Sequence, residues 1–449
     1  MSKDIRIKKG LDIKLVGVAE KNTTKSSQSS VYAVKPEDFH GITPKLVAKE
    51  GAEVKAGDTL FYSKSDERIL FPSPVSGKVT EVIRGARRKV LAVKIAADTT
   101  QVYKDFGAKD ADTLSAEEVK NHLLASGCWP FVKQRPYDVV ANPNQAPKAI
   151  FISAYASAPL AADLEYTLAG KEAELQAAIT AVSKLTEGLV HVSVGANTTS
   201  PLANLKGIEL HKVSGPHPSG NVGTQIAKLD PINKGEVVWV ITPQDLVVIG
   251  ELLLTGKLNV SRTIALTGSQ FSKPQYVTAI SGALIADVTA NNLNDDNTRI
   301  ISGNVLSGKE VKADDFLGYY DNQITAIPEG DDYEFFGWNK PIFNKISTSR
   351  ALTFSWLTPK KKYDLNTNTN GEHRAFVVTG SYEEVFPLDI YPMQLLKAFM
   401  YKDLDEMEAL GGYEVAPEDF ALTEFVCVSK QPHQKIIREG LDLMREELG

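Results

Sequence analysis

Two glycines, Gly215 and Gly220, have the spacing of a phosphate-binding loop, in which backbone N–H groups surround the phosphates of a nucleotide. They lie between a strand-like run and a helix-like run, where such loops occur. A working loop of that kind continues with Lys and then Ser or Thr, but Asn221-Val222 stand at those positions. Pro216 and Pro218 also remove two N–H donors. The sequence therefore predicts a loop that does not hold nucleotide phosphates.

The same loop contains the best candidate contact residues of the chain. His217 lies between two prolines, so its backbone is restricted, and an imidazole is a versatile ligand. We predict that it contacts a ligand or a partner together with its neighbours Pro218, Gly220 and Gly223. The alternative is that His217 and the nearby His211 are ordinary loop histidines.

Motifs for catalysis or metal binding are missing from the sequence. The seven histidines show neither His-x-x-x-His nor His-Glu-x-x-His spacing, and Cys128 and Cys427 are too few for a disulfide framework or a four-ligand metal site. No Gly-x-Ser-x-Gly nucleophile motif occurs. We therefore assign no catalytic residue and no metal ligand to this chain.

Two basic runs stand out, one at residues 84–89 and one at Lys360-Lys361-Lys362. Both can be interpreted as solvated turns. The first run has a sharper alternative, in which Arg84, Arg87 and Arg88 contact acidic loops or lipid headgroups of a membrane partner.

The composition excludes several classes of protein. A chain of 449 residues with 43% hydrophobic and 24% charged residues is typical of a soluble protein with more than one domain. The formal net charge of −6 argues against nucleic acid as a partner. The first residues are charged, so we expect no secretory signal. The most apolar window, 237–254, is interrupted by Pro243, Asp245 and Glu251, so we expect no transmembrane segment.

The first hundred residues alternate short β-like runs with Gly and Pro, and the segments 51–60 and 71–79 resemble the two halves of a biotinyl/lipoyl barrel-sandwich domain. Carrier proteins of that fold bear a lysine at the tip of a hairpin. The corresponding position here is Asp66, and Lys64 lies two residues before it. A structural or docking module is therefore favoured over a carrier.

The remaining patterns predict a mixed α/β and β multidomain fold. Strands alternate with helices from Ala149 to Leu254, which favours a Rossmann-like parallel sheet. Short strands follow, and helices are expected at 391–410 and 434–448. We predict these units: barrel-sandwich domain 1–100, connecting segment 101–147, Rossmann-like domain 148–257, small β-grasp or SLBB-like domain 258–330, linking segment 331–373, and helical C-terminal domain 374–449.

The surroundings of Cys427 resemble electron-transfer subunits in which a Cys-x-x-Cys-x-x-Cys run binds a [4Fe–4S] cluster, although one thiolate cannot hold such a cluster.

Taken in order, the domains resemble the NqrA family, the A subunits of Na⁺-translocating NADH:quinone reductases, which are six-subunit bacterial respiratory pumps. The resemblance is carried by residues 5–12, 73–77, 84–88, 214–220, 301–308 and 425–427. It also implies a relation in fold to the NADH-binding subunit of complex I and to the C subunit of the Rnf complex.

The resemblance implies a peripheral position at the cytoplasmic face of the bacterial inner membrane. It implies support of ubiquinone reduction coupled to Na⁺ export. The main partner would be the integral membrane B subunit, and ubiquinone is a possible ligand. FMN, FAD, riboflavin and the iron–sulfur centres would lie on partner subunits, and none on this chain. Two alternatives remain, an autonomous flavin- or NADH-dependent oxidoreductase and a biotinyl- or lipoyl-type carrier.

Overall fold

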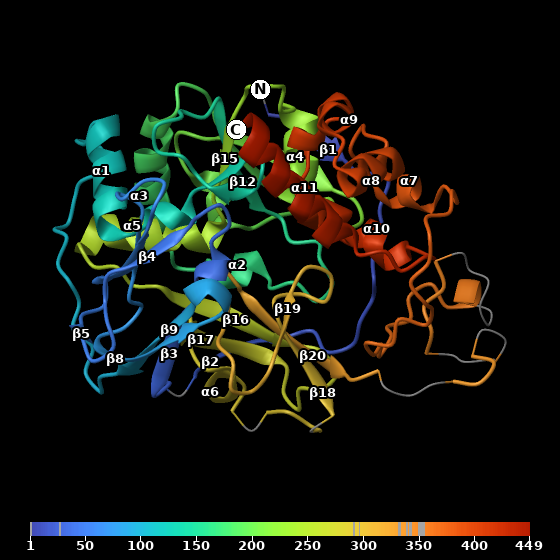
Figure 1. Ribbon diagram of the computed structural model, residues 1–449, viewed down its shortest axis with the longest axis horizontal. Helices are drawn as coiled ribbons and strands as arrows, with labels where there is room; N and C mark the ends of the chain where they lie inside the picture. Colours follow the sequence, from blue (N-terminus) through green and yellow to red (C-terminus); the bar gives the residue numbers. More distant parts are fainter. Residues whose placement is uncertain are drawn as a thin grey trace.

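The computed structural model describes residues 2–26, 28–290, 292–295, 297–330, 334–337, 340, 344–348 and 355–449. Four units are visible in Figure 1: a β-rich unit on the left, a parallel sheet with helices above, a small β unit below, and a group of helices at the upper right. The mixed α/β and β multidomain fold predicted from the sequence is confirmed.

A seven-stranded sheet forms the centre of the molecule, in the order β1-β14-β13-β12-β15-β10-β11. The first five of these strands run parallel, β10 is antiparallel to β15, and β11 is antiparallel to β10. The strands are β1 (Asp4–Arg6), β14 (Glu209–Ser214), β13 (Val190–Gly195), β12 (Ala149–Ala154), β15 (Val238–Val240), β10 (Lys133–Arg135) and β11 (Val139–Val140). Both faces of this sheet are covered, so β12 is nearly continuously apolar, and β13 is buried as well although it contains His191 and Ser193.

Alternate residues of β12 divide between the two faces. Ile150 and Ile152 join the large core formed with helices α3 (Glu172–Val182) and α5 (Pro243–Thr255). Phe151 packs on the other face against Ile226 of α4 (Val222–Leu229). Two further helices, α1 (Ala116–Ser126) and the short α2 (Leu164–Thr167), complete this unit.

The N-terminal β unit contains two small sheets, ordered β3-β9-β8-β5 and β4-β6-β7. Stacked rings of Phe61 and Phe71, 4.8 Å apart, lie in its core. Its strands are β3 (Val31–Val34), β4 (Pro44–Leu46), β5 (Glu53–Val54), β6 (Thr59–Ser63), β7 (Leu70–Pro72), β8 (Gly77–Arg84) and β9 (Val90–Ala97).

The first two strands of the chain lie outside that unit. Strand β1 pairs with β14, so that Ile5 lies beside Val213. Strand β2 (Glu20–Lys25) pairs with β17 in the small β unit. The first 25 residues therefore add an edge strand to each of two other sheets before the barrel begins. The domain boundaries given above stay a prediction.

The small β unit is a six-stranded sheet in the order β19-β18-β20-β16-β17-β2. Its further elements are β16 (Ser261–Thr267), β17 (Gln275–Ile280), α6 (Ile285–Thr289), β18 (Thr298–Ser302), β19 (Lys309–Val311) and β20 (Gln323–Pro328).

The C-terminal helices have their own apolar core, which includes Tyr382, Leu396 and Leu441. They are α7 (Ser381–Val385), α8 (Pro392–Tyr401), α9 (Leu404–Ala409), α10 (Ala421–Val426) and α11 (His433–Leu448). The expected single helix at 391–410 is divided, because Lys402 adopts a left-handed conformation and the Asp403 side chain caps α9. Within the described residues, no helix has the length and apolar character needed to cross a membrane.

Candidate functional site

The loop at 215–221 connects β14 to α4 at the carboxyl edge of the central sheet, where α/β proteins commonly bind ligands. Gly215 has a φ of 133°, and a Cβ there would lie 2.3 Å from the carbonyl oxygen of Ile7. The loop is thus held tightly against the chain that follows β1. The His217-Pro218 peptide is cis.

His217 points into the protein. Its side chain is 3% exposed, its Nδ1 lies 3.0 Å from Ser157 Oγ, and its backbone N–H donates to Asp12 Oδ1 at 3.0 Å. Burial lowers the pKa of the imidazole to about 4, so the ring is neutral at pH 7. Pro218 is buried as well. In this conformation His217 stabilises the loop through its contacts with Ser157 and Asp12. Its predicted contact with a ligand or a partner stays a prediction.

Ser157 accepts a backbone hydrogen bond of the kind that a phosphate-binding loop directs at its ligand. The Gly220 N–H donates to Ser157 Oγ at 2.7 Å, while the Gly220 carbonyl accepts from Ser153 Oγ at 2.8 Å. A Cβ on Gly220 would lie 2.4 Å from the carbonyl oxygen of Tyr155. Gly220 is therefore required for close packing between two loops of this chain.

The N-terminus of α4 is also occupied by a group of this chain. Asp419, from the 3₁₀ helix η8 (Pro417–Phe420), lies over the first turn, and a Cβ on Gly223 would come within 2.5 Å of its carboxylate. Arg135 donates to Asp419 at 2.8 Å and to Glu418 at 2.6 Å. A helix N-terminus favours an anion, which the C-terminal helical unit here supplies as a side chain. Gly223 is the residue that leaves room for this ion pair.

The strand order reverses between β12 and β15, and this switch point is the usual ligand crevice of a doubly wound sheet. Here the small β unit packs against it. Arg262 of β16 contacts Asp245, near the start of α5, at 2.5 Å, and both side chains are buried. On the other side of the switch point, the Asp163 N–H donates to Tyr276 Oη of β17 at 2.9 Å. The chain thus covers both sides of this crevice, with one buried ion pair and one partly buried hydrogen bond.

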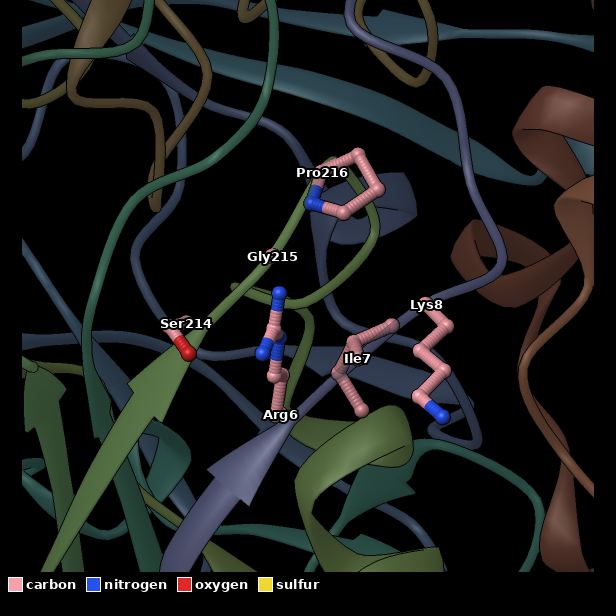
Figure 2. A pocket seen from close by; sticks show the side chains of 6 residues that line it. All are labelled: Arg6, Ile7, Lys8, Ser214, Gly215 and Pro216. Carbon is pink, nitrogen blue, oxygen red and sulfur yellow. The ribbon is translucent and has the colours of Figure 1, made fainter.

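An open hollow of about 620 Å³ remains beside the loop. Figure 2 shows it at the ends of β1 and β14, with the side chains of Arg6 and Lys8 on either side of Ile7. Ser214, Gly215 and Pro216 complete its lining. The two cations are exposed, so the hollow is open to solvent and flanked by positive charge.

The predicted basic contact residues lie apart from this edge of the sheet. Arg84 ends β8, and Arg87 and Arg88 lie in the 3₁₀ turn η2 (Ala86–Arg88) that leads to β9. All three side chains are exposed at the hairpin tip, where Arg84 Nη1 donates to the Arg88 carbonyl at 3.2 Å. Their predicted role in contacting a partner stays a prediction.

The two cysteines are free thiols, and both are buried away from solvent. Cys427 Sγ lies 2.8 Å from Tyr382 Oη inside the C-terminal core, and burial raises the pKa of Cys128 to about 12. The part of the chain that the structure describes contains no group of three or more His, Cys, Asp or Glu side chains that could hold a metal ion.

The hairpin between β6 and β7 presents no lysine at its tip. Asp66 is ion-paired to Arg68 at 2.6 Å, and Arg68 in turn donates to Asn144 Oδ1 at 2.7 Å. The tip is therefore tied to the turn before β12 rather than free to carry a prosthetic group.

Comparison with known proteins identifies the family. Residues 5–98 match the model of the NqrA N-terminal barrel-sandwich hybrid domain, 114–258 that of the NqrA second alpha/beta domain, and 263–313 that of the NQRA C-terminal domain. The chain is 37% identical over 446 residues to the A subunit of the Na(+)-translocating NADH-quinone reductase of Neisseria meningitidis serogroup B, covering 99% of this chain and 100% of that protein. The chain belongs to the NqrA family.

Relatives from other bacteria agree. The family member from Pasteurella multocida is 35% identical, with 99% of this chain and 100% of that protein covered, and the one from Rhodopirellula baltica is 36% identical, with 98% of each covered. A solved NAD⁺-reducing [NiFe]-hydrogenase chain shares 10% identity over 67% of this chain and 55% of its own, with a TM-score of 0.35, which is too low to support an argument.

Several residues that shape this NqrA-family site carry no sequence signal. Ser157 and Asp419 are single polar residues in unremarkable segments, and Arg135 belongs to no basic run. Only the glycines that they approach, Gly220 and Gly223, are visible as a pattern.

Proposed function

We propose that this chain is the A subunit of a Na⁺-translocating NADH–quinone reductase, in which it acts as a peripheral scaffold that carries no cofactor of its own. The carrying observation is the match of 446 residues, end to end, to proteins that bear this name. In this proposal the chain lies at the cytoplasmic face of the inner membrane and docks on integral membrane subunits, chiefly the B subunit. The flavins and iron–sulfur centres lie on the partners.

The geometry of the carboxyl edge supports the scaffold role over an autonomous oxidoreductase. The three places where a doubly wound sheet would hold a nucleotide or flavin phosphate are filled by Ser157, by Asp419 and by the Arg262–Asp245 pair. Each of these groups is hydrogen-bonded to another segment of the chain, so a phosphate could bind there only if that hydrogen bond or ion pair were broken. The Asp66 tip likewise disfavours a lipoyl-type carrier.

The proposal is tested by tagging the chain in its host, extracting membranes with a mild detergent and purifying through the tag. We expect integral membrane subunits to co-purify, together with Na⁺-stimulated NADH:quinone reductase activity. A chain that purifies alone from intact membranes would contradict the proposal.

Three measurements on the purified chain separate the alternatives. Flavin absorbance or NADH oxidation by the chain alone would support the autonomous oxidoreductase. An adduct on Lys64 in the intact mass would support the carrier. Ubiquinone binding by the chain alone would show that the scaffold also interacts with quinone.

A further inference from the structure

One exposed segment combines an aromatic–aliphatic pair with a lysine cluster. Trp356 and Leu357 lie in the 3₁₀ helix η6 (Ser355–Leu357), and each side chain is 58% exposed. Three consecutive lysines, Lys360 to Lys362, follow after two residues. We call residues 355–363 the Trp-Lys segment. It is the short orange helix and the chain after it at the right edge of the molecule in Figure 1.

The end of the Trp-Lys segment is anchored to the body of the protein. Tyr363 is buried, its N–H donates to the Lys14 carbonyl at 2.8 Å, and its own carbonyl accepts from the Val16 N–H at 3.1 Å. Lys14 Nζ also donates to the Pro359 carbonyl at 3.0 Å. A fourth ammonium group is thereby held beside the three lysines.

The charged side chains of the Trp-Lys segment itself are all positive. No Asp or Glu occurs in residues 355–363. Lys360 and Lys362 are exposed, and among the described residues neither has an ion-pair partner. Lys361 lies over the Tyr363 ring, with its Nζ 5.4 Å from the ring centroid.

This combination matches the chemistry of a lipid–water interface. Tryptophan favours the headgroup level because its ring is apolar and its N–H is polar, and an exposed leucine gains from entering the acyl boundary. Lysines next to these side chains attract anionic headgroups. The other basic run, at the tip of the β8–β9 hairpin, has arginines but no exposed aromatic side chain, so it lacks half of this pattern.

We propose that the Trp-Lys segment and Lys14 form a contact surface for anionic lipid headgroups, with Trp356 and Leu357 entering the interface. The proposal rests on the proposed function for its setting in the cell, because a subunit docked on membrane proteins is kept next to the bilayer. It adds a direct contact between this chain and lipid.

The test uses the purified full-length chain and vesicles of phosphatidylcholine, with or without phosphatidylglycerol. We expect co-sedimentation with the anionic vesicles, reduced by high salt, and little with phosphatidylcholine alone. Each lysine near an anionic surface contributes about a fivefold gain in partitioning, so Lys360→Gln combined with Lys362→Gln should weaken binding roughly 25-fold. Trp356→Ala with Leu357→Ala should weaken it on the order of tenfold.

The matched control is Lys49→Gln with Lys55→Gln, which removes two exposed lysines from the barrel and should leave vesicle binding unchanged. Thermal melting shows whether each variant is folded. In a Trp338→Phe background, quenching of tryptophan fluorescence by brominated lipids should fall in Trp356→Ala, because the two remaining tryptophans, Trp129 and Trp239, are buried.

Two results would overturn the proposal. One is equal binding of the wild-type chain to anionic and neutral vesicles, or no binding to either. The other is unchanged vesicle binding by the Trp-Lys variants. If those variants also fail to join the membrane subunits, this face is a protein-docking surface. If the chain binds anionic vesicles through this segment but co-purifies with no membrane protein of the complex, the proposed function fails and the lipid contact stands.

Discussion

Replacing Asp419 with Asn tests how the C-terminal helical unit is joined to the central sheet. The amide keeps the shape of the side chain and an oxygen for the Ala416 N–H, which now donates to Asp419 Oδ2 at 2.9 Å. It removes the charge that neutralises Arg135, whose side chain is 2% exposed. The variant therefore isolates the ionic part of the contact.

Breaking a buried ion pair on one side costs about 3 to 5 kcal/mol, because the remaining charge stays buried without compensation. Glu418 still lies 2.6 Å from Arg135, but its side chain is 40% exposed, so it compensates only in part. We expect the lower end of that range, roughly 3 kcal/mol.

The quantity to measure is the free energy of local opening, by native-state hydrogen exchange followed by mass spectrometry. Amides of α4 and of residues 415–426 should lose protection together, while the barrel strands should not change. A matched control is Lys435→Met, which removes an exposed pair with Glu439 and should change stability by less than about 0.5 kcal/mol.

A double-mutant cycle adds the single variant Arg135→Met and the double variant Arg135→Met with Asp419→Asn. Since both charges are removed in the double variant, it should be more stable than the sum of the two single effects by more than about 1 kcal/mol. Additive single effects, or a loss below about 1 kcal/mol for Asp419→Asn, would refute the view that this ion pair joins the two units.

Three further predictions concern the loop and the cysteines. Gly220→Ala should lower the urea midpoint by the equivalent of about 1 to 3 kcal/mol, because its Cβ would meet the Tyr155 carbonyl at 2.4 Å; an unchanged midpoint would contradict the packing described here. Because His217 titrates near 4 in the folded chain and near 6.5 when unfolded, the unfolded state binds the proton first, and stability should fall by up to roughly 3 kcal/mol between pH 6.5 and 4; His217→Gln should flatten that slope in urea titrations. A thiol reagent should label neither Cys128 nor Cys427 until urea is added, and rapid labelling of the native chain would show that either core opens.

The sequence predicted the architecture well because its periodic patterns are local. The apolar runs that became β12 and β13 and the stripe that became α3 each contain their own signal. The division between α8 and α9 was missed because a left-handed Lys402 has no strong preference in sequence. The pairing of β1 with β14 was missed because a three-residue strand does not specify a partner so distant in the chain.

The candidate site was predicted in outline only. Missing Lys and Ser side chains indicated that the loop after β14 binds no phosphate, but nothing near the loop indicated that Ser157 and Asp419 fill its place. The prolines beside His217 fix the backbone without determining whether the ring faces outward or inward. Such contacts depend on how loops meet in space, which a single sequence does not reveal.

The threading of the N-terminal residues through two distant sheets sets an order of events during synthesis. Lys3 and His211, which are hydrogen-bonded, are 208 residues apart in the chain. At a translation rate of about 5–20 residues per second, β1 leaves the ribosome roughly 10 to 40 s before β14 can pair with it. β2 waits longer for β17. The barrel can fold in the meantime, so the first residues to be synthesised are among the last to pair. In the folded chain, these N-terminal strands link the central sheet to the small β unit.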